Sequence, residues 1–336
     1  MSRTRRVASA AAYSGGGVGL AGLLAAVLLF GQARLARRTI PSAEAPPPRC
    51  DGRYGTEHEG EPIRLAMLGD SSAAGLGVDL PRETPGAVLA CGLAERLHRP
   101  ILLRNFAVVG STSMGLVPQR ELALDWRPDL AVILVGANDV THRVRVPVAV
   151  GHLAETVRLL RAEGAAVVVG TCPDLGTIRP IQLPLRWLCR QWSRDMAAAQ
   201  TVAVVEAGGA TVSLGDLLGP EFAASPETMF AADRFHPSAA GYFAAASAML
   251  PTVVAGSGGP IETGRVPAPG DGVRSLAQAA VEAVDQAGTE VSGAEVAGEE
   301  RGPAGRWADL RHRLRARVER PQDPVDPSGV QGGVRT

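Results

Sequence analysis

The chain has 336 residues, of which 46% are hydrophobic, so it is long enough for one large or two modest domains with a sizeable core. The 34 basic and 34 acidic side chains give a formal net charge of zero. The net charge of the whole chain therefore gives no indication that the protein binds nucleic acid. The four cysteines show neither a C-x-x-C pair nor a zinc-ligand spacing, which argues against a metal site built from thiolates.

The N-terminus carries a predicted membrane anchor. Residues 7–33 have no charged side chain, and this stretch is long enough to cross a bilayer of about 30 Å as a helix. A cleaved signal peptide is the alternative, but its apolar region is normally shorter and ends at a small-residue cleavage site, whereas "RLARR" follows here. We therefore predict an uncleaved single-pass anchor over 1–38. Arginines flank the span on both sides and leave its orientation open, and we expect the domain to be extracytoplasmic.

Composition divides the remainder of the chain into three parts. Residues 39–61 are rich in Pro, Gly and acidic side chains and are predicted to form an extended linker. An α/β domain is expected over 62–256. Residues 257–336 are rich in Gly, Pro, Glu and Arg, which predicts a largely disordered tail. Two helical segments, 273–288 and 306–320, interrupt this tail. The second has one apolar stripe among arginines, which suits an anionic lipid surface, a partner, or simply solvent.

Five short apolar runs recur within the predicted domain, with helical stretches between them. The runs are 63–68, 101–109, 130–135, 165–170 and 201–207. Runs of this length rich in Val, Ile and Leu are typical of strands buried on both faces of a parallel sheet. Segments 84–98 and 148–164 place apolar residues at helical spacing, and Gly164 is suited to end the second helix. The pattern predicts a doubly wound α/β sandwich of about five parallel strands, with its site at their carboxyl ends.

A serine follows the first predicted strand. The motif Gly69-Asp70-Ser71-Ser72 comes directly after the apolar run and is followed by small residues. Ser and Asp are favoured at helix N-caps, so ordinary strand-to-helix punctuation is one interpretation. Presentation of Ser71 as a nucleophile at the carboxyl edge of the sheet is the other.

A base and its acceptor stand together later in the chain. A serine hydroxyl needs a base to remove its proton, and that base needs an acceptor to orient it. The segment "DRFHP" supplies both, because Asp233 and His236 are close enough for the carboxylate to reach Nδ1 while Nε2 faces the serine. We expect Pro237 to occupy the first position of the following helix.

Donors for a developing oxyanion follow the second and third predicted strands. Gly110 has no side chain, so its N–H can approach a ligand closely. Asn138 offers a side-chain amide, and the N–H of Ser71 is a third donor. Each residue alone is consistent with turn chemistry, but together and in this order they favour an oxyanion hole.

Three neighbouring features have simpler interpretations. Asp139 is expected to brace the Asn138 loop, and His142 to be a polar loop residue or to border the pocket. The Pro-rich segment 170–189 is expected either to form one wall of an acyl pocket or to pack a helix onto the sheet. Within it, Cys172 and Cys189 are spaced for a disulfide worth about 3 kcal/mol if the domain is extracytoplasmic, and buried thiols are the alternative.

Taken together, these motifs resemble a known family. "GDSS" with Ser71, Gly110, "GAND" with Asn138, and "DRFH" with Asp233 and His236 are similar to the four blocks of the SGNH hydrolases, also called the GDSL esterase/lipase family. The resemblance covers about 65 to 245, nearly the whole predicted domain. It departs from the family at Ser72, where a leucine is frequent, and that leucine takes no part in the chemistry.

The resemblance implies a fold, a reaction and site residues. The fold would be a flavodoxin-like three-layer α/β/α sandwich. The reaction would be hydrolysis of a small-molecule or lipid ester through an acyl-serine, with no metal and no cofactor. Ser71, Asp233 and His236 would be catalytic, and the oxyanion hole would comprise Ser71, Gly110 and Asn138. An acyltransferase that uses the same acyl-serine, and a non-catalytic binding domain held at the membrane, are the alternatives, and nothing in the sequence predicts the oligomeric state.

Overall fold

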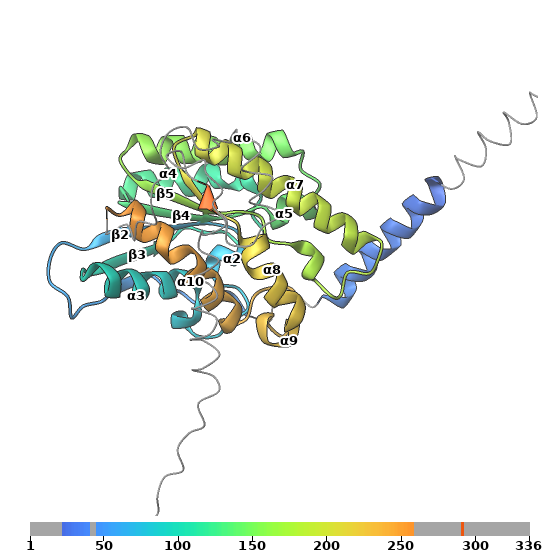
Figure 1. Cartoon of the computed structure of the whole chain (residues 1–336), viewed down its shortest axis with the longest axis horizontal. Coiled ribbons are helices and arrows are strands. Elements are labelled where there is room, and N and C mark those ends of the chain that lie inside the picture. Colours follow the sequence, from blue (N-terminus) through green and yellow to red (C-terminus); the bar gives the residue numbers. More distant parts are fainter. Residues whose placement is uncertain (1–21, 41–44, 259–289, 292–336) are drawn as a thin grey trace, which may run out of the picture.

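The structure, a computed structural model of the chain, describes residues 22–40, 45–258 and 290–291. Within these residues the backbone forms one mixed sheet in the order β1-β3-β2-β4-β5-β6-β7 (Figure 1). The strands are β1 (Gly52–Tyr54), β2 (Ile63–Gly69), β3 (Ile101–Asn105), β4 (Leu130–Leu134), β5 (Ala166–Gly170), β6 (Ala210–Val212) and β7 (Glu290–Val291). Strands β2 to β6 pair in parallel, whereas β1 and β7 pair antiparallel at the two edges. The five parallel strands confirm the predicted α/β fold.

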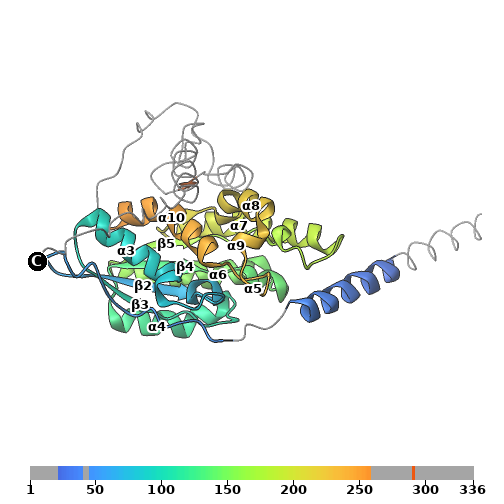
Figure 2. The same ribbon diagram turned by 90° about the horizontal axis from the view of Figure 1, so that it is seen from below.

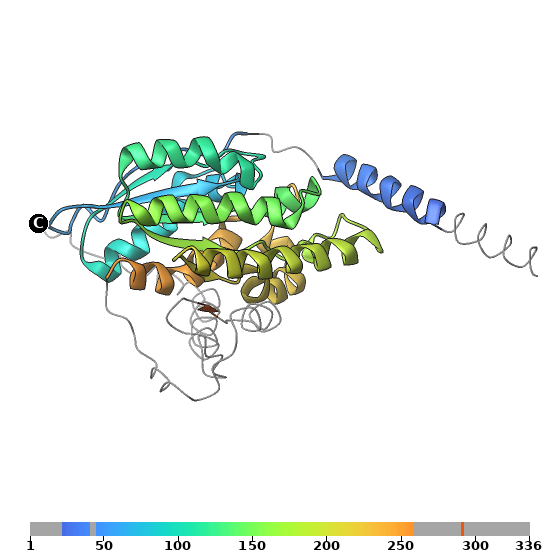
Figure 3. The same cartoon turned by 90° about the horizontal axis from the view of Figure 1, so that it is seen from above.

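Helices cover both faces of this sheet and complete a three-layer sandwich. One face carries α3 (Pro85–Leu97) and α10 (Ala239–Gly256), which lie side by side in Figure 2. The other face carries α4 (Leu116–Trp126), α6 (Val146–Ala162) and α7 (Leu185–Glu206), as Figure 3 shows. The flavodoxin-like three-layer arrangement is therefore confirmed, as are the helices predicted over 84–98 and 148–164.

Shorter helices gather at the carboxyl ends of the parallel strands. They are α2 (Ser71–Ala74) after β2, η2 (Ser113–Gly115) after β3, α5 (Ala137–Thr141) after β4, η3 (Leu175–Thr177) after β5, and α8 (Leu214–Ala224) with α9 (Pro226–Met229) after β6. A further 3-10 turn, η1 (Pro81–Glu83), precedes α3, and a helix over 22–39 precedes the sheet. One edge of the sheet is thus enclosed by short elements that can carry a site.

Strand β2 shows why the chain forms a sandwich. Leu65 and Met67 pack into the apolar cluster under α3 and α10, whereas Ala66 and Leu68 pack into the cluster under α4 and α6. Because successive side chains of a strand point to opposite faces, burial of all four residues requires cover on both sides of the sheet.

The strand that we predicted over 201–207 was wrong. These residues form the end of α7, where Val204 packs fully buried against the sheet. The chain leaves the helix through Gly208, at φ +84°, and the fifth parallel strand is β6, only three residues long. An apolar run of this length is equally compatible with the buried face of a helix and with a buried strand.

Both outer strands come from segments in which we predicted none. Residues 52–54 lie inside the predicted linker 39–61 and form β1, which pairs with β3. Just before it, Cys50 is buried, and its carbonyl oxygen accepts a hydrogen bond from Oη of Tyr54 at 2.7 Å. Strand β7 lies inside the predicted tail. Two- and three-residue strands are too short to show an alternating pattern.

One described helix, α10, has the length and hydropathy of a membrane span. Core helices also meet this criterion, and α10 packs Ala246, Met249 and Val253 into the cluster that it shares with α3. Of the anchor predicted over 1–38, the structure describes a helix over 22–39. Residues 1–21 and the tail helices predicted over 273–288 and 306–320 lie outside the described residues.

Cys172 and Cys189 do not form a disulfide. Both are free, buried thiols of the same apolar cluster. Burial raises the pKa of each thiol, most strongly for Cys172, so both are held in the protonated form. The structure therefore supports the alternative of buried cysteines that act as small apolar side chains.

Gly69 allows β2 to approach β4 at the point where the first strand ends. Its φ of +135° lies in the region that favours glycine, and a Cβ at this position would lie 1.9 Å from the carbonyl oxygen of Leu134. The next residue, Asp70, donates its N–H to that same oxygen at 3.0 Å. The turn into α2 therefore depends on the absence of a side chain at residue 69.

We expect Gly69→Ala to lower the free energy of unfolding by more than about 1 kcal/mol, because the new methyl group would collide with backbone that cannot move away. Gly151→Ala is the matched control, since Gly151 lies within α6 with no atom near the added methyl group. The control should be neutral or stabilising by up to about 1 kcal/mol. Urea unfolding measures both, and an equal shift for the two variants would contradict the role of Gly69.

Candidate active site

Ser71 is the first residue of α2 and stands directly beyond β2. Asp70 caps this helix, since its Oδ1 accepts the N–H of Ser72 at 2.8 Å. The serine is buried, at 7% exposure, yet it lines a cavity at the carboxyl edge of the sheet. Asp70 thus provides the helix cap expected of a strand-to-helix turn, and Ser71 lines the cavity.

His236 joins Ser71 to Asp233. Its Nε2 lies 3.0 Å from Oγ of Ser71, and its Nδ1 lies 2.5 Å from Oδ2 of Asp233. Burial alone would raise the pKa of Asp233, but hydrogen bonds from the His236 ring and from the N–H groups of Phe235 and His236 lower it below its usual range. The carboxylate is thus held in its ionised form against the imidazole. Residues 165 positions apart in the sequence meet within hydrogen-bond distance.

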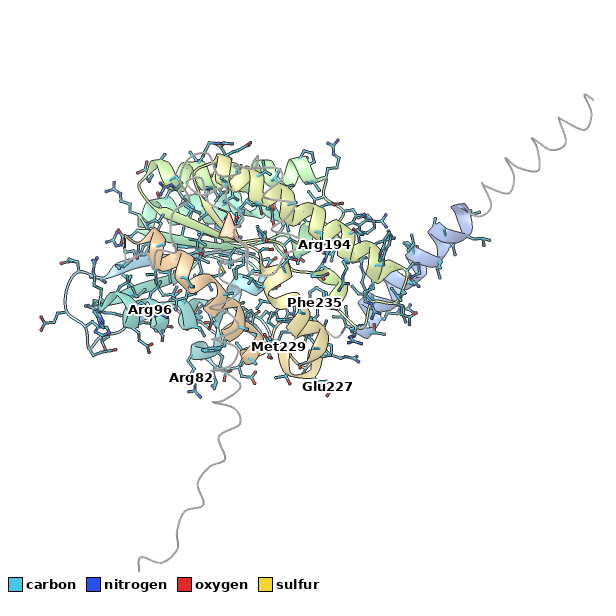
Figure 4. The ribbon with its side chains drawn as sticks, in the orientation of Figure 1. Arg82, Arg96, Arg194, Glu227, Met229 and Phe235 are labelled. Carbon is cyan, nitrogen blue, oxygen red and sulfur yellow. The ribbon has the colours of Figure 1, made fainter. Side chains whose placement is uncertain are left out.

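A closed turn holds the histidine in place. Ala231 donates its N–H to the carbonyl oxygen of His236 at 2.8 Å, and Arg234 occupies the left-handed region at φ +57°. Phe235 packs its ring edge-on against the imidazole, with centroids 5.0 Å apart, and belongs to the apolar cluster of Met229. Figure 4 shows both labelled side chains on the α8–α9 side of the domain.

The position that we predicted for Pro237 was wrong. Helix α10 begins at Ala239, and Ser238 is its N-cap, with Oγ accepting the N–H of Gly241 at 3.2 Å. Pro237 lies before the cap and forms a β-bridge with Phe230. Because Ser238 provides the cap, the helix begins two residues after Pro237.

Asn138 lines the same cavity from α5. Its Nδ2 donates to the carbonyl oxygen of Ser111 at 3.0 Å, which links α5 to the loop after β3. Gly110 lies in that loop, exposed, at φ +80° and with no atom near the position of a Cβ. Val108 of the same loop donates its N–H to the carbonyl oxygen of Gly69 at 3.1 Å, so the loop lies against the end of β2.

Asp139 fastens α5 to η2, as predicted. The carboxylate is fully buried and accepts the N–H of Ser113 at 3.0 Å and its hydroxyl at 2.9 Å. Burial raises the pKa of Asp139, and the two bonds from Ser113 oppose this shift. His142 is an exposed loop residue whose Nδ1 lies 2.8 Å from the carbonyl oxygen of Asn138.

Two buried glutamines that our sequence analysis missed connect the strand ends. The amide of Gln119, on α4, accepts the N–H of Gly69 at 2.7 Å and donates to its carbonyl oxygen at 2.9 Å. The amide of Gln200, on α7, accepts the N–H of Cys172 at 2.7 Å and donates to the carbonyl oxygen of Val135 at 2.9 Å. Each satisfies backbone groups where the sheet ladder stops. A single polar residue on the apolar face of a helix is the signal that would have revealed them.

The cavity beside Ser71 has a volume of about 100 Å³. Beyond the polar groups its walls are mostly apolar, and the apolar side chains that line it include Leu134, Leu175, Ile178, Leu214, Leu218 and Phe222. Segment 170–189 divides between two environments. Its first half lines the cavity, and its second half, with Leu185 and Cys189, packs in the cluster beneath α7. Within the described ranges, no three His, Cys, Asp or Glu side chains gather as metal ligands.

An α/β sandwich with a serine, a histidine and a carboxylate in hydrogen-bonded series is an arrangement of hydrolases. The sequence model of the GDSL-like lipase/acylhydrolase family matches residues 67–244. The chain is 44% identical over 263 residues to the GDSL-like esterase Rv1075c of Mycobacterium tuberculosis. The matched region covers 74% of this chain and 83% of that protein. The chain therefore belongs to the GDSL-like lipase/acylhydrolase family and is an SGNH-type esterase.

Solved structures with similar folds include two named proteins. TesA is 25% identical, with a TM-score of 0.48, over 57% of this chain and 99% of its own. The acetylxylan esterase Axe2 of Geobacillus stearothermophilus is 22% identical, with a TM-score of 0.40, over 61% of this chain and 99% of its own.

The buried carboxyl of Asp70 makes the stability of the protein depend on pH. Burial raises its pKa from 3.8 to about 6, although the N–H of Ser72 and the charge of His236 oppose the shift. The folded state therefore holds this proton more tightly than the unfolded state, and ionisation of Asp70 costs stability as the pH rises from about 4 to about 6. Asp70→Asn lacks this cost.

Between pH 4 and pH 7, the unfolding free energy of Asp70→Asn should gain about 2 kcal/mol relative to the unsubstituted protein. Denaturant unfolding at both pH values provides the measurement. Asp125→Asn, at an exposed position of α4, is the control and should show the same difference from the unsubstituted protein at both pH values. If the difference in unfolding free energy between Asp70→Asn and the unsubstituted protein were the same at both pH values, the raised pKa of Asp70 would be refuted.

Proposed function

We propose that this esterase hydrolyses carboxylic esters through an acyl-serine formed on Ser71. The observation that carries the proposal is the hydrogen-bonded series from Ser71 Oγ through the imidazole of His236 to the carboxylate of Asp233. Oγ attacks the ester carbonyl while Nε2 takes its proton, and the ionised carboxylate stabilises the imidazolium that forms. The imidazolium then gives the proton to the leaving alcohol, and the neutral ring activates water to release the acid.

The oxyanion of each tetrahedral intermediate needs preorganised donors. We assign this role to the N–H groups of Ser71 and Gly110 and to the side-chain amide of Asn138. An amide carries two N–H bonds, and in Asn138 one of them is used on Ser111, which orients the other. The hydrogen bonds of Asp139, Gln119 and Val108 support the proposal, because they hold the three donor-bearing segments together.

The cavity is suited to the acyl group of the ester. A cavity of about 150 Å³ lined by Leu, Ile and Phe accepts benzene, so about 100 Å³ suits an apolar chain of about four carbons. Leu218, on α8, is one of the apolar side chains that line this space. We therefore propose that short-chain acyl esters are the preferred substrates.

We also propose the topology of the chain. Residues 1–38 would anchor it in the membrane as a single span, 39–61 would connect the anchor, 62–256 would form the catalytic domain outside the cytoplasm, and 257–336 would form the tail. The described part of the anchor supports this proposal, because its first turns expose Leu23, Leu24, Val27 and Phe30 and contain no charged side chain.

The catalytic assignment is tested on the purified full chain with 4-nitrophenyl butyrate. Ser71→Ala should abolish turnover and labelling by a fluorophosphonate, because both need the activated hydroxyl. Asn138→Ala should retain labelling while kcat falls about 100-fold or more through loss of one oxyanion donor. Ser225→Ala, at an exposed position without a side-chain cap bond, is the control and should match the unsubstituted protein. Equal turnover by Ser71→Ala and the unsubstituted protein would disprove the assignment.

The acyl pocket is tested by lengthening it. Leu218→Ala should raise kcat/KM for an octanoyl ester relative to a butyryl ester about tenfold, because loss of the isopropyl group enlarges the cavity that Leu218 lines. Leu217→Ala is the matched control, since Leu217 is the adjacent residue of α8 and packs towards the core instead of lining the cavity. If the two variants shift the chain-length profile alike, the cavity is not the acyl pocket.

A further inference from the structure

The helix over 22–39 is attached to the domain at the edge that carries the site. The amide of Gln32 donates from Nε2 to the carbonyl oxygen of Leu183 at 2.5 Å and accepts the N–H of Leu185 at 3.1 Å. One turn later, Ala36 is buried in the cluster that includes Ile181 and Leu185. The second half of the helix is thus part of the domain surface, packed on the segment that follows β5.

A second attachment reaches the turn of the catalytic histidine. Nη2 of Arg234 donates to the carbonyl oxygen of Thr39 at 3.2 Å, at the end of the helix. A guanidinium is favourable there, because the last carbonyl groups of a helix carry partial negative charge. Arg234 lies between Asp233 and His236, so the end of the helix lies beside the catalytic turn. Figures 1, 2 and 3 show the helix projecting from this end of the domain, beyond the start of α7.

The first half of the helix extends away from the domain. Leu23, Leu24, Val27 and Phe30 are each more than 60% exposed. A helix with apolar side chains on every side is suited to lipid rather than to water. Its arginines, Arg34 among them, lie in the half nearest the domain, where lipid headgroups would accept their charge.

Apolar side chains are also exposed around the site itself. Leu183 and Trp187, beside the attachment of Gln32, are 61% and 56% exposed. Val108, Val109 and Met114, in the segment around Gly110, are between 47% and 63% exposed. Both groups belong to segments that follow carboxyl ends of parallel strands. Exposed apolar side chains gathered at one edge mark a site of interaction with a protein or a membrane, and tryptophan is favoured at membrane–water interfaces.

We propose that the active site faces the bilayer that the N-terminal helix enters, and that the substrate is a short-chain acyl ester of a membrane-embedded alcohol. This proposal rests on the proposed function of Ser71 and names its substrate class. The alcohol stays in the bilayer while its acyl group enters the cavity of about 100 Å³. Oγ of Ser71 adds to the acyl carbon, the bond from that carbon to the alcohol oxygen then breaks, and His236 gives the proton it took from Ser71 to the alcohol. Water then cleaves the acyl-serine and releases the acid.

The full chain in vesicles of ether-linked phosphatidylcholine tests this proposal. The embedded substrate is the butyryl ester of a dialkylglycerol, which has a single ester bond, and the soluble substrate is 4-nitrophenyl butyrate. Trp187→Gln should lower the rate on the embedded ester about tenfold, the loss expected from one interfacial aromatic contact, and leave the rate on the soluble ester unchanged. Leu122→Gln, at an exposed apolar position of α4 away from this edge, should change neither rate.

The possible outcomes distinguish a failure of the proposed function from a failure of the membrane-facing site. No Ser71-dependent cleavage of the soluble ester would refute the proposed function. Normal cleavage of the soluble ester, combined with an unchanged rate on the embedded ester in Trp187→Gln, would refute the membrane-facing site. Equal loss on both substrates would also refute it, because that outcome describes damage to the catalytic centre.

A readout independent of activity tests the orientation. In vesicles that contain brominated phosphatidylcholine, the intrinsic fluorescence of the full chain should be quenched, and Trp187→Phe should lose most of that quenching. Trp126→Phe is the matched control, because Trp126 ends α4 at the opposite edge of the sheet, ahead of β4, and its removal should leave the quenching in place. Identical quenching in Trp187→Phe and the unsubstituted protein would place this edge away from the bilayer.

Discussion

The hydrogen bond between the imidazole of His236 and the hydroxyl of Ser71 depends on the order of the strands. Ser71 leaves the sheet after β2, and His236 arrives from the segment that follows β6. Because the parallel strands end at one edge of the sheet, the segments after β2 and β6 come within 3.0 Å of each other there. The proposed chemistry depends on this closeness, since a hydroxyl without a base in contact is a poor nucleophile.

Buried polar side chains hold that edge in place. A parallel ladder stops where the strands diverge into loops, and the backbone groups there would otherwise lack partners. Gln119 satisfies them at Gly69, and Gln200 at Val135 and Cys172. Asp139 does the same for η2. An apolar replacement at any of these positions would leave buried donors or acceptors unpaired, which costs more than the packing that it would gain.

Much of this arrangement was predictable from local pattern, because burial on both faces leaves continuous apolar runs and because separated motifs in a fixed order limit the possible site. Strands β2 to β5 and the positions of Ser71, Asp233 and His236 followed from such patterns. Other features depend on tertiary partners that no local pattern records. The buried end of α7 has the composition of a strand, β1 is too short to show alternation, and Gln119 is polar because of a strand end 50 residues away.

Catalysis and membrane contact share one edge of the sheet in this account, and the proposed catalysis depends on Ser71 carrying the acyl group. Mass spectrometry of the full chain, quenched with acid during turnover of a butyryl ester and digested, measures this most directly. We expect one added butyryl group on the peptide that contains Ser71, and none in Ser71→Ala. A butyryl group on any other residue, present also in Ser71→Ala, would contradict the central claim.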